Sequence, residues 1–486
     1  MRRYTGFILN IGALMLGIWA AARWGSVCVD AAARVDFRYL FNYTEGVMSA
    51  SVLRIGADPW IYGDLTRWPY ILMPYNPAVS YLAYLGTLPG AGVLTAGRLV
   101  ALLSAAGVSV VLYGLGRSSG MRRRVALVTG LVPFAVPVFS KSTYVFLPDM
   151  TALFWTLAGL YEMLRFEKEG RRRYAVFGAA AFVLAVFSKQ NFVWGAVAVM
   201  MHWAARRRFR RMSALAAAML LGAGIPMLVL QWLTHGHYAS HVFFSPSTIS
   251  SYAVAMVGYF WRVALPGIWP LLVVAAASLA FDLRQRRSHP LGWYLVLCLV
   301  STLLLGKVGS GDNYFIEVTA ALALGAGRLL EATLRSAGRR GAAAAAAVLA
   351  LLGAQLAADP APLTPRPSKI RKDLAVTESR FDEFGPLIRG ARGEVLAENL
   401  GLLIANHREV TYLPFEYTQL ARLGKIDENL ILKKIRLHDY GLIILETNPA
   451  LVSRSSRFSA NFLDAVRRYY RLAGQKYGQL FFIPAK

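Results

Sequence analysis

The chain has 486 residues, 56% of them hydrophobic, and its mean hydropathy is +0.43. Charged residues make up 16% of the chain, whereas soluble proteins carry about 25%, so an ordinary soluble protein is excluded. The net charge of +26 does not indicate a nucleic-acid partner, because the arginines cluster between apolar segments, as the loop charges of membrane proteins do. The composition predicts a polytopic membrane protein.

Eleven apolar segments predict membrane-spanning helices. The first stays uncharged between Arg3 and Arg23, which is long enough to span, so it is interpreted as a retained helix and not as a cleaved signal peptide. The expected spans are residues 5–23, 92–116, 125–140, 150–165, 174–188, 191–205, 213–233, 264–281, 290–306, 315–331 and 341–358.

The loops between these spans differ in basic charge. One set of short loops carries 21 lysines and arginines, and the alternate loops before residue 358 carry eight over longer segments. Because basic loops stay on the cytoplasmic side, the N-terminus is predicted to be cytoplasmic. With an odd number of spans, the C-terminal tail then lies outside, on the same side as the first outer loop, residues 24–90.

A Pro-rich linker, residues 358–368, separates the membrane part, residues 1–358, from a tail of different composition. Residues 359–486 carry 20 basic and 14 acidic residues and no spanning segment. Short apolar runs predict strands at EVLAE, LLIA, YGLIILET and QLFFIPA, and amphipathic helices are predicted at FEYTQLARLGK, DENLILKKIRL and SANFLDAVRRYYRLA. The alternation predicts a small α/β domain outside the membrane.

Cysteine and histidine give no strong sign of a disulfide or a metal centre. Cys28 and Cys298 lie far apart, and no CxxC spacing occurs. His235, His237 and His241 share one loop without a matching carboxylate. No cofactor or metal is expected, although dependence on a divalent metal stays open.

Ionisable residues gather in the loops that are predicted to lie outside. The first outer loop holds Asp30, Asp36, Glu45, Asp58 and Asp64. Further polar groups at this face are Arg98, Lys141, Asp149, Lys189, Gln190, Lys307, Asn313 and Tyr314. Charges are costly in the hydrocarbon layer, so their gathering at one face is informative. Because lysine and arginine bind phosphate well, the pattern predicts an outer cavity where a lipid phosphate meets a substrate.

Several short motifs recur in the same order as in a known family. They are TEG, LRIGADPWIYGD and PYNPAVSYL in the first outer loop, then GRL, PD, KQN and GSGDNYFIE, and FEYTQLARLGKIDENLILKKI in the tail. Together they resemble the GT-C membrane glycosyltransferases that use polyprenyl-phosphate sugars, related to protein O-mannosyltransferases and aminoarabinose transferases (glycosyltransferase family 39-like). The resemblance covers most of the chain.

The resemblance implies an inverting sugar transfer in which an acid of the first outer loop is the general base. Glu45 is the matching position, and because Thr44 precedes it where many relatives have Asp, Asp36 stays a candidate beside it. Asp149 is the third catalytic candidate. Phosphate or substrate binding is expected from Arg98, Lys141, Lys189, Gln190, Lys307, Asn313 and Tyr314.

Each candidate also has a structural alternative. Glu45 would pair with a nearby arginine such as Arg38 or Arg54, Asp149 would cap a helix, and Lys189 would reach from a hairpin tip to the membrane surface.

The expected protein is thus a glycosyltransferase of a bacterial inner membrane. Its partners would be membrane lipids, a polyprenyl-phosphate sugar, and a glycan, lipid or protein acceptor outside. Two rival interpretations are a transporter or flippase of lipid-linked sugars and a non-catalytic subunit of an envelope complex. A transporter more often carries charged or broken-helix positions near the membrane midplane. The sugar, the prenyl length, the acceptor and the oligomeric state are not predicted.

Overall fold

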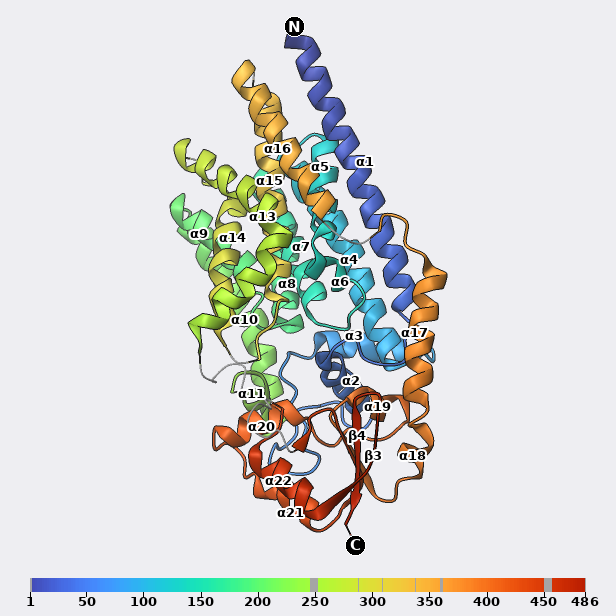
Figure 1. Ribbon diagram of the computed structural model, residues 1–486. Coiled ribbons are helices and arrows are strands. Elements are labelled where there is room, and N and C mark those ends of the chain that lie inside the picture. Colours follow the sequence, from blue (N-terminus) through green and yellow to red (C-terminus); the bar gives the residue numbers. More distant parts are fainter. Residues whose placement is uncertain are drawn as a thin grey trace.

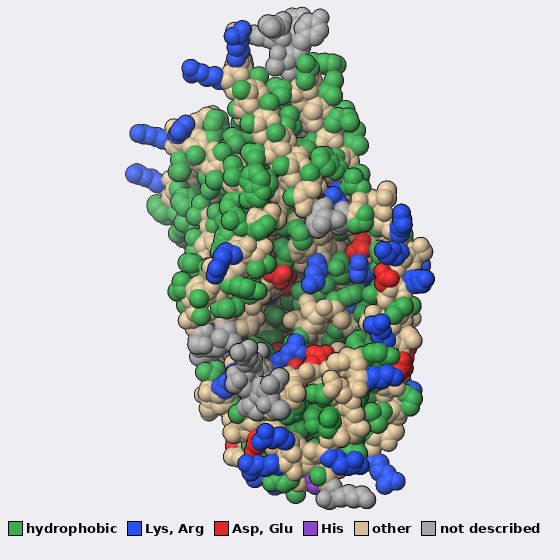
Figure 2. Space-filling view, in the orientation of Figure 1, with side chains coloured by type: hydrophobic (Ala, Val, Ile, Leu, Met, Phe, Trp, Pro, Cys, Tyr) green, Lys and Arg blue, Asp and Glu red, His purple; other side chains and the backbone are tan. Residues whose placement is uncertain are grey.

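The protein has two parts in the computed structural model, an elongated bundle of helices and a smaller C-terminal domain at one end of it (Figure 1). The structure describes residues 2–244, 252–286, 288–307, 309–336, 338–358, 362–449 and 457–485. The chain begins at the far end of the bundle from the C-terminal domain (Figure 1). Hydrophobic side chains cover most of the bundle, and lysines and arginines project from its far end (Figure 2).

The bundle contains thirteen of the described helices and two short 3₁₀ segments. They are α1 (Arg2–Arg34), α4 (Val93–Ser118), α5 (Arg123–Leu131), η1 (Val132–Ala135), α6 (Pro137–Lys141), α7 (Asp149–Glu169), α8 (Arg172–Ser188), α9 (Trp194–Ala205), α10 (Phe209–Leu233), α11 (His237–Val242), α13 (Val254–Arg284), α14 (Pro290–Ser301), η2 (Thr302–Gly306), α15 (Tyr314–Arg335) and α16 (Arg339–Ala358).

Each expected span coincides with a helix or with a run of short helices. The segment expected at 125–140 is broken into α5, η1 and α6, with Pro133 and Pro137 at the starts of the last two. Proline lacks a backbone donor and cannot continue a helix ladder. Among the described residues, five helices are long and apolar enough to cross a membrane, namely α1, α4, α10, α13 and α16. The count of eleven spans and their orientation stay predictions.

Helix α15 forms the centre of the bundle. Every residue from Phe315 to Gly327 is buried, and the helix packs against α13, α14, α16 and α5. Most of these residues are apolar, as expected for a helix in the interior, and the buried Glu317 accepts a hydrogen bond from Tyr294 at 3.1 Å. The N-terminal end of α15 lies at the end of the bundle that is close to the C-terminal domain.

The first outer loop contributes two helices, α2 (Tyr43–Ile55) and α3 (Ala78–Thr87), which lie between the bundle and the C-terminal domain (Figure 1). The residue Asn42 caps α2, because its side chain accepts a hydrogen bond from the Glu45 backbone at 3.0 Å. Nine of the thirteen residues of α2 are buried. The loop is thus an internal layer of the fold and not a solvent-exposed connection.

The C-terminal domain is a four-stranded sheet with helices around it. Strand order is β1-β2-β4-β3, with β1 parallel to β2 and the other pairs antiparallel. The strands are β1 (Glu394–Ala397), β2 (Tyr440–Leu445), β3 (Tyr470–Lys476) and β4 (Gln479–Pro484). The helices are α17 (Pro367–Asp382), α18 (Gly385–Gly390), α19 (Leu400–Ala405), α20 (Pro414–Arg422), α21 (Asn429–Arg436) and α22 (Ala460–Tyr469).

The prediction of a strand at LLIA is wrong, because this run lies in the helix α19. The Asn399 side chain caps that helix by accepting from the Gly401 backbone at 3.1 Å, and a short apolar run alone does not distinguish a strand from a buried helix. The expected helix ending in YYRLA stops at Tyr469, and β3 begins at the next residue. Part of the Pro-rich linker, residues 359–361, lies outside the described residues.

The C-terminal domain docks directly on the first outer loop. Tyr70 donates its backbone N–H to the Thr411 carbonyl at 2.8 Å. At Gly46 of α2, an added Cβ would lie 2.8 Å from the Cβ of Leu400 in α19. The two segments share one apolar core, which also includes Val47 and Leu403. Because of this packing, the loop has the bundle on one side and the domain on the other.

Candidate functional site

Glu45 lies in the first turn of α2 and makes a buried ion pair with Arg98 of α4. Its carboxylate is 2.9 Å from Nε and 3.0 Å from Nη2 of Arg98, and both side chains are 0% exposed. It also accepts the backbone N–H groups of Phe41 at 2.6 Å and Phe146 at 2.9 Å. Two carboxylate oxygens accept about four hydrogen bonds, so the acceptor capacity of Glu45 is filled.

Arg98 connects α4 to the segment that precedes α2. Its guanidinium donates to the carbonyl of Phe37 and, at 2.7 Å, to the carbonyl of Tyr39. It also lies 4.4 Å from the centroid of the Phe41 ring. A fully hydrogen-bonded buried pair of this kind orders the loop around it. The structural alternative paired Glu45 with Arg38 or Arg54, and in the structure its partner is Arg98 of a different helix.

Three of the sequence candidates meet at a second buried cluster. Oδ1 of Asp149 is 2.7 Å from Nζ of Lys189 and accepts the Asn313 amide at 3.0 Å. Asp149 begins α7, Lys189 directly follows α8, and Asn313 precedes α15. The rings of Tyr75 and Tyr314 lie near this cluster, and the centroid of each ring is 5.6 Å from Nζ of Lys189.

The cluster has unused hydrogen-bonding capacity. Oδ2 of Asp149 is buried and has no hydrogen-bond partner among the described residues. The ammonium of Lys189 carries three donors and has aromatic rings near it, an arrangement that favours a cation in a partly dry site. The remaining donors of such a lysine can bind an oxyanion.

Gln190 and His241 hold the chain around this cluster. The Gln190 amide donates to the carbonyls of Pro74 at 2.9 Å and Val242 at 3.2 Å. His241 Nδ1 accepts the Met73 backbone N–H at 2.9 Å, and its Nε2 is 2.7 Å from the carbonyl of Gly63. Burial lowers the pKa of His241 to about 4, so the ring is neutral and links the first outer loop to α11.

Other candidates lie elsewhere on this side of the molecule. Asp36 and Lys141 are exposed. Lys307 is half-buried at the end of η2, where its backbone pairs with Tyr252. The sequence candidates thus divide into the Glu45–Arg98 pair, the Asp149–Lys189–Asn313 cluster with Tyr314, and these separate residues.

A cavity of about 210 Å³ lies where the first outer loop meets the C-terminal domain. Its walls are Tyr43, Thr44, Val47, Leu72, Pro74, Tyr75, Gly309, Phe415, Glu416 and Arg457. Oε2 of Glu416, in the first turn of α20, accepts the Tyr43 hydroxyl at 2.7 Å. Burial raises the pKa of Glu416 to about 7.

Sequence reasoning missed Glu416. Tyr43 and Glu416 are 373 residues apart in the chain, so no local pattern brings them together. The one sequence signal was the tail stretch FEYTQLARLGK, which contains this acid and was noted for its family resemblance.

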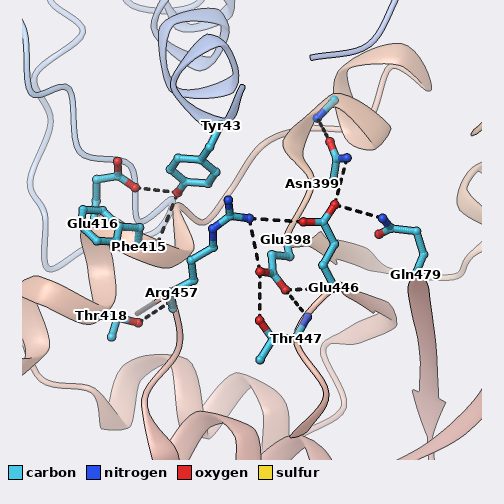
Figure 3. A network of polar contacts seen from close by, with 11 residues as sticks. Tyr43, Glu398, Asn399, Phe415, Glu416, Thr418, Glu446, Thr447, Arg457 and Gln479 are labelled. Atoms are coloured by element: carbon cyan, nitrogen blue, oxygen red, sulfur yellow. Dashed lines mark hydrogen bonds and ion pairs between the residues drawn. The ribbon is translucent and has the colours of Figure 1, made fainter. Parts of the chain in front are cut away.

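Arg457 lines the cavity together with Phe415 and Glu416 of the same domain, and its polar contacts are drawn in Figure 3. Its guanidinium carbon lies 4.8 Å from the centroid of the Tyr43 ring, and Nη1 is 3.3 Å from Glu398. Glu398 in turn accepts the backbone N–H groups of Glu446 at 2.8 Å and Thr447 at 2.7 Å. This network anchors Arg457 to the end of the sheet.

Comparisons with known proteins agree on one architecture. No family model and no curated protein matches the sequence. Among solved structures, ArnT from Cupriavidus metallidurans bound to undecaprenyl phosphate has a TM-score of 0.64 at 15% identity, over 96% of this chain and 97% of that one. The apo oligosaccharyltransferase of Archaeoglobus fulgidus has a TM-score of 0.57 at 12% identity, over 96% and 74%.

The chain has the GT-C fold. This confirms the resemblance drawn from the sequence motifs and the expected mainly helical architecture with a small C-terminal α/β part. At 15% and 12% identity, the structural similarity establishes the fold. The substrates have to be inferred from the residues of the site. Together with the five long apolar helices, it makes the chain a multi-pass membrane protein.

Proposed function

We propose that the protein is a glycosyltransferase that moves a sugar from a polyprenyl phosphate to an acceptor outside the cytoplasm. The observation that carries the proposal is the buried Lys189, whose Nζ is 2.7 Å from Asp149 Oδ1 and 5.6 Å from the ring centroids of both Tyr75 and Tyr314, while Asn313 donates to the same Asp149 oxygen. The shared fold with ArnT, which was solved bound to undecaprenyl phosphate, supports this donor class.

In the proposed reaction, the lipid phosphate is the leaving group. Lys189 stabilises its developing negative charge, as fixed cations do in water-excluded sites. Asp149 and Asn313 orient the lysine before the donor arrives. Arg98, Lys141, Gln190, Lys307 and Tyr314 are proposed as further donor contacts or supports. We propose no resident cofactor, and the assay includes a chelator to detect a divalent metal.

A carboxylate must take the proton of the acceptor hydroxyl on the face opposite the departing phosphate, as in inverting sugar transfer. The sequence candidates for this role are Glu45, Asp36 and Asp149. Glu45 would have to leave some of its four hydrogen bonds to act as the base. Its replacement by Gln therefore needs two measurements, folding and transfer.

The proposed setting is a bacterial inner membrane with the N-terminus in the cytoplasm and the C-terminal domain outside. The acceptor would be a glycan, a lipid or a protein. The Pro-rich linker is proposed as the boundary between the membrane part and this domain.

The testing experiment measures release of polyprenyl phosphate in proteoliposomes, with a panel of polyprenyl-phosphate sugars and envelope extract as acceptor. It is run with and without EDTA. Lys189→Met is expected to abolish release and to weaken binding of undecaprenyl phosphate. The control is Lys168→Met, an exposed lysine at the other end of α7, which should change neither.

Two results would contradict the proposal. The first is unchanged phosphate binding and transfer in Lys189→Met. The second is no release from any donor by the wild type, which would favour a transporter or a non-catalytic subunit.

A further inference from the structure

The cavity between the first outer loop and the C-terminal domain is small and has a mixed aromatic and charged lining. At about 210 Å³, it is smaller than the 300–1,000 Å³ pockets that hold whole small ligands. Its lining combines aromatic rings with one carboxylate and one guanidinium. This composition suits the hydroxyl-bearing end of a larger molecule.

The cavity adjoins the proposed phosphate site through one shared side chain. Tyr75 lines the cavity, and its ring centroid is 5.6 Å from Nζ of Lys189. A hydroxyl bound in the cavity and a phosphate bound at Lys189 would therefore lie on either side of the Tyr75 ring. That is the arrangement which a transfer between an acceptor and a lipid-linked donor requires.

The carboxylates near this site differ in how they are occupied. Glu45 is 0% exposed and accepts four hydrogen bonds. Asp149 binds Lys189 and Asn313 through Oδ1, and although its Oδ2 has no partner among the described residues, Asp149 does not line the cavity. Glu416 lines the cavity, and its oxygen that does not bond Tyr43 points away from that ring (Figure 3). Of these three acids, Glu416 is the one in the cavity wall.

We propose that the cavity binds the acceptor and that Glu416, supplied by the C-terminal domain, is the general base of the transfer. The proposal rests on the function proposed above. The Glu416 carboxylate takes the proton of the acceptor hydroxyl while that oxygen bonds to C1 of the donor sugar. The bond between C1 and the phosphate oxygen breaks, and polyprenyl phosphate leaves with the bonding electron pair.

The electrostatic surroundings of Glu416 suit this role. Burial raises its pKa to about 7, against lowering by the Tyr43 hydrogen bond and the charge of Arg457. The other titratable groups that face it are Tyr75 and Tyr412. A base with a pKa near the working pH combines an ionised fraction with proton affinity. Transfer should therefore fall as the pH drops below about 7, when Glu416 becomes protonated.

The first test is Glu416→Gln in the proteoliposome assay, with binding of undecaprenyl phosphate measured in parallel. The amide still accepts the Tyr43 hydroxyl, so a contact that only joins the domains would survive and transfer would stay normal. A general base would be lost, with transfer expected to fall about 10²–10⁴-fold while phosphate binding persists. Glu409→Gln, at an exposed position of the same domain, is the matched control and should leave transfer unchanged.

The second test is the pH profile of Tyr43→Phe. Removing the Tyr43 hydrogen bond raises the pKa of Glu416, so the acidic limb of the profile should move to higher pH. An unmoved limb, or full activity in a folded Glu416→Gln protein, would overturn the role of Glu416. Loss of phosphate binding in Lys189→Met together with normal transfer by Glu416→Gln would reject this inference and leave the proposed function standing. No release by the wild type from any donor would overturn both.

Discussion

At the scale of single residues, the charged groups are of two kinds. Some, such as Glu45 and Arg98, are paired in the interior, and others, such as Glu416, line the cavity. Glu45 and Arg98 are both fully buried, and each is bonded to backbone groups as well as to the other. A charge removed from such a pair leaves its partner unpaired in a low-dielectric interior. Glu45, which the sequence motif predicts to be catalytic, therefore also belongs to a buried ion pair of the fold. Separate experiments are needed for its catalytic and its structural role.

We predict strong coupling between these two residues in protein stability. Arg98→Met should lower the free energy of unfolding by about 3–5 kcal/mol, because the buried carboxylate of Glu45 would lose its cationic partner. The double variant Arg98→Met/Glu45→Met should cost clearly less than the sum of the single variants. Thermal unfolding of all four proteins in the same detergent measures this cycle. Additive effects would show that the pair is not a coupled unit.

Glu45→Gln tests the remaining catalytic prediction at the same position. If this variant folds and binds undecaprenyl phosphate but does not release it from the donor, Glu45 acts as the base. Normal transfer in the folded variant would leave the base role to Glu416 or to Asp149.

At the scale of elements, close contact between α2 and α19 joins the first outer loop to the C-terminal domain. The contact occurs at Gly46, where an added Cβ would meet Cβ and Cδ1 of Leu400 at 2.8 and 2.9 Å. Real Cβ atoms do not approach so closely, so one helix would have to move. Because α2 also carries Tyr43 and Thr44 into the cavity wall, a shift at Gly46 would alter the cavity.

Gly46→Ala is therefore predicted to destabilise the protein by about 1–3 kcal/mol, as overpacked cores generally are. Its control is Gly25→Ala in α1, where nothing lies within 4 Å of the added Cβ. There the substitution should be neutral or stabilise by about 0.5–1 kcal/mol, because alanine favours helices. Thermal unfolding compares the two, and equal effects would contradict the packing argument.

At the scale of the whole molecule, the GT-C fold brings three separate regions to one end of the bundle. The first outer loop, the N-terminal end of α15 and the C-terminal domain all contribute to the walls around Lys189 and Glu416. Neither the bundle nor the domain holds the cavity by itself. We therefore expect the C-terminal domain to be needed for transfer, beyond any role in folding.

The orientation in the membrane is predicted from loop charge and is measurable in intact cells. In a Cys28→Ser background, a membrane-impermeant thiol reagent should label Glu409→Cys in the C-terminal domain. It should not label Lys168→Cys, at the opposite end of α7, until the cells are opened. Both positions are exposed in the structure. The reverse pattern would put the proposed site on the cytoplasmic side.

Hydropathy and charge along the chain were sufficient to predict the positions of the bundle helices and the mainly helical class, because both depend on neighbouring residues within one element. The strand predicted at LLIA is a helix in the structure, because a run this short does not reveal its period and Asn399 caps the helix. Motifs indicated Asp149, Lys189 and Asn313 as polar groups between apolar segments, and only the folded chain shows that they meet.

Tertiary structure alone decided which of these residues are partners. Glu45 and Arg98 are 53 residues apart, Asp149 and Asn313 are 164 apart, and Tyr43 and Glu416 are 373 apart. Contacts at such separations depend on how the elements pack, and local sequence patterns carry no record of that packing. The sequence by itself therefore determined where the apolar helices lie and which polar groups stand between them. Packing of the C-terminal domain on the first outer loop determined where such groups line a cavity.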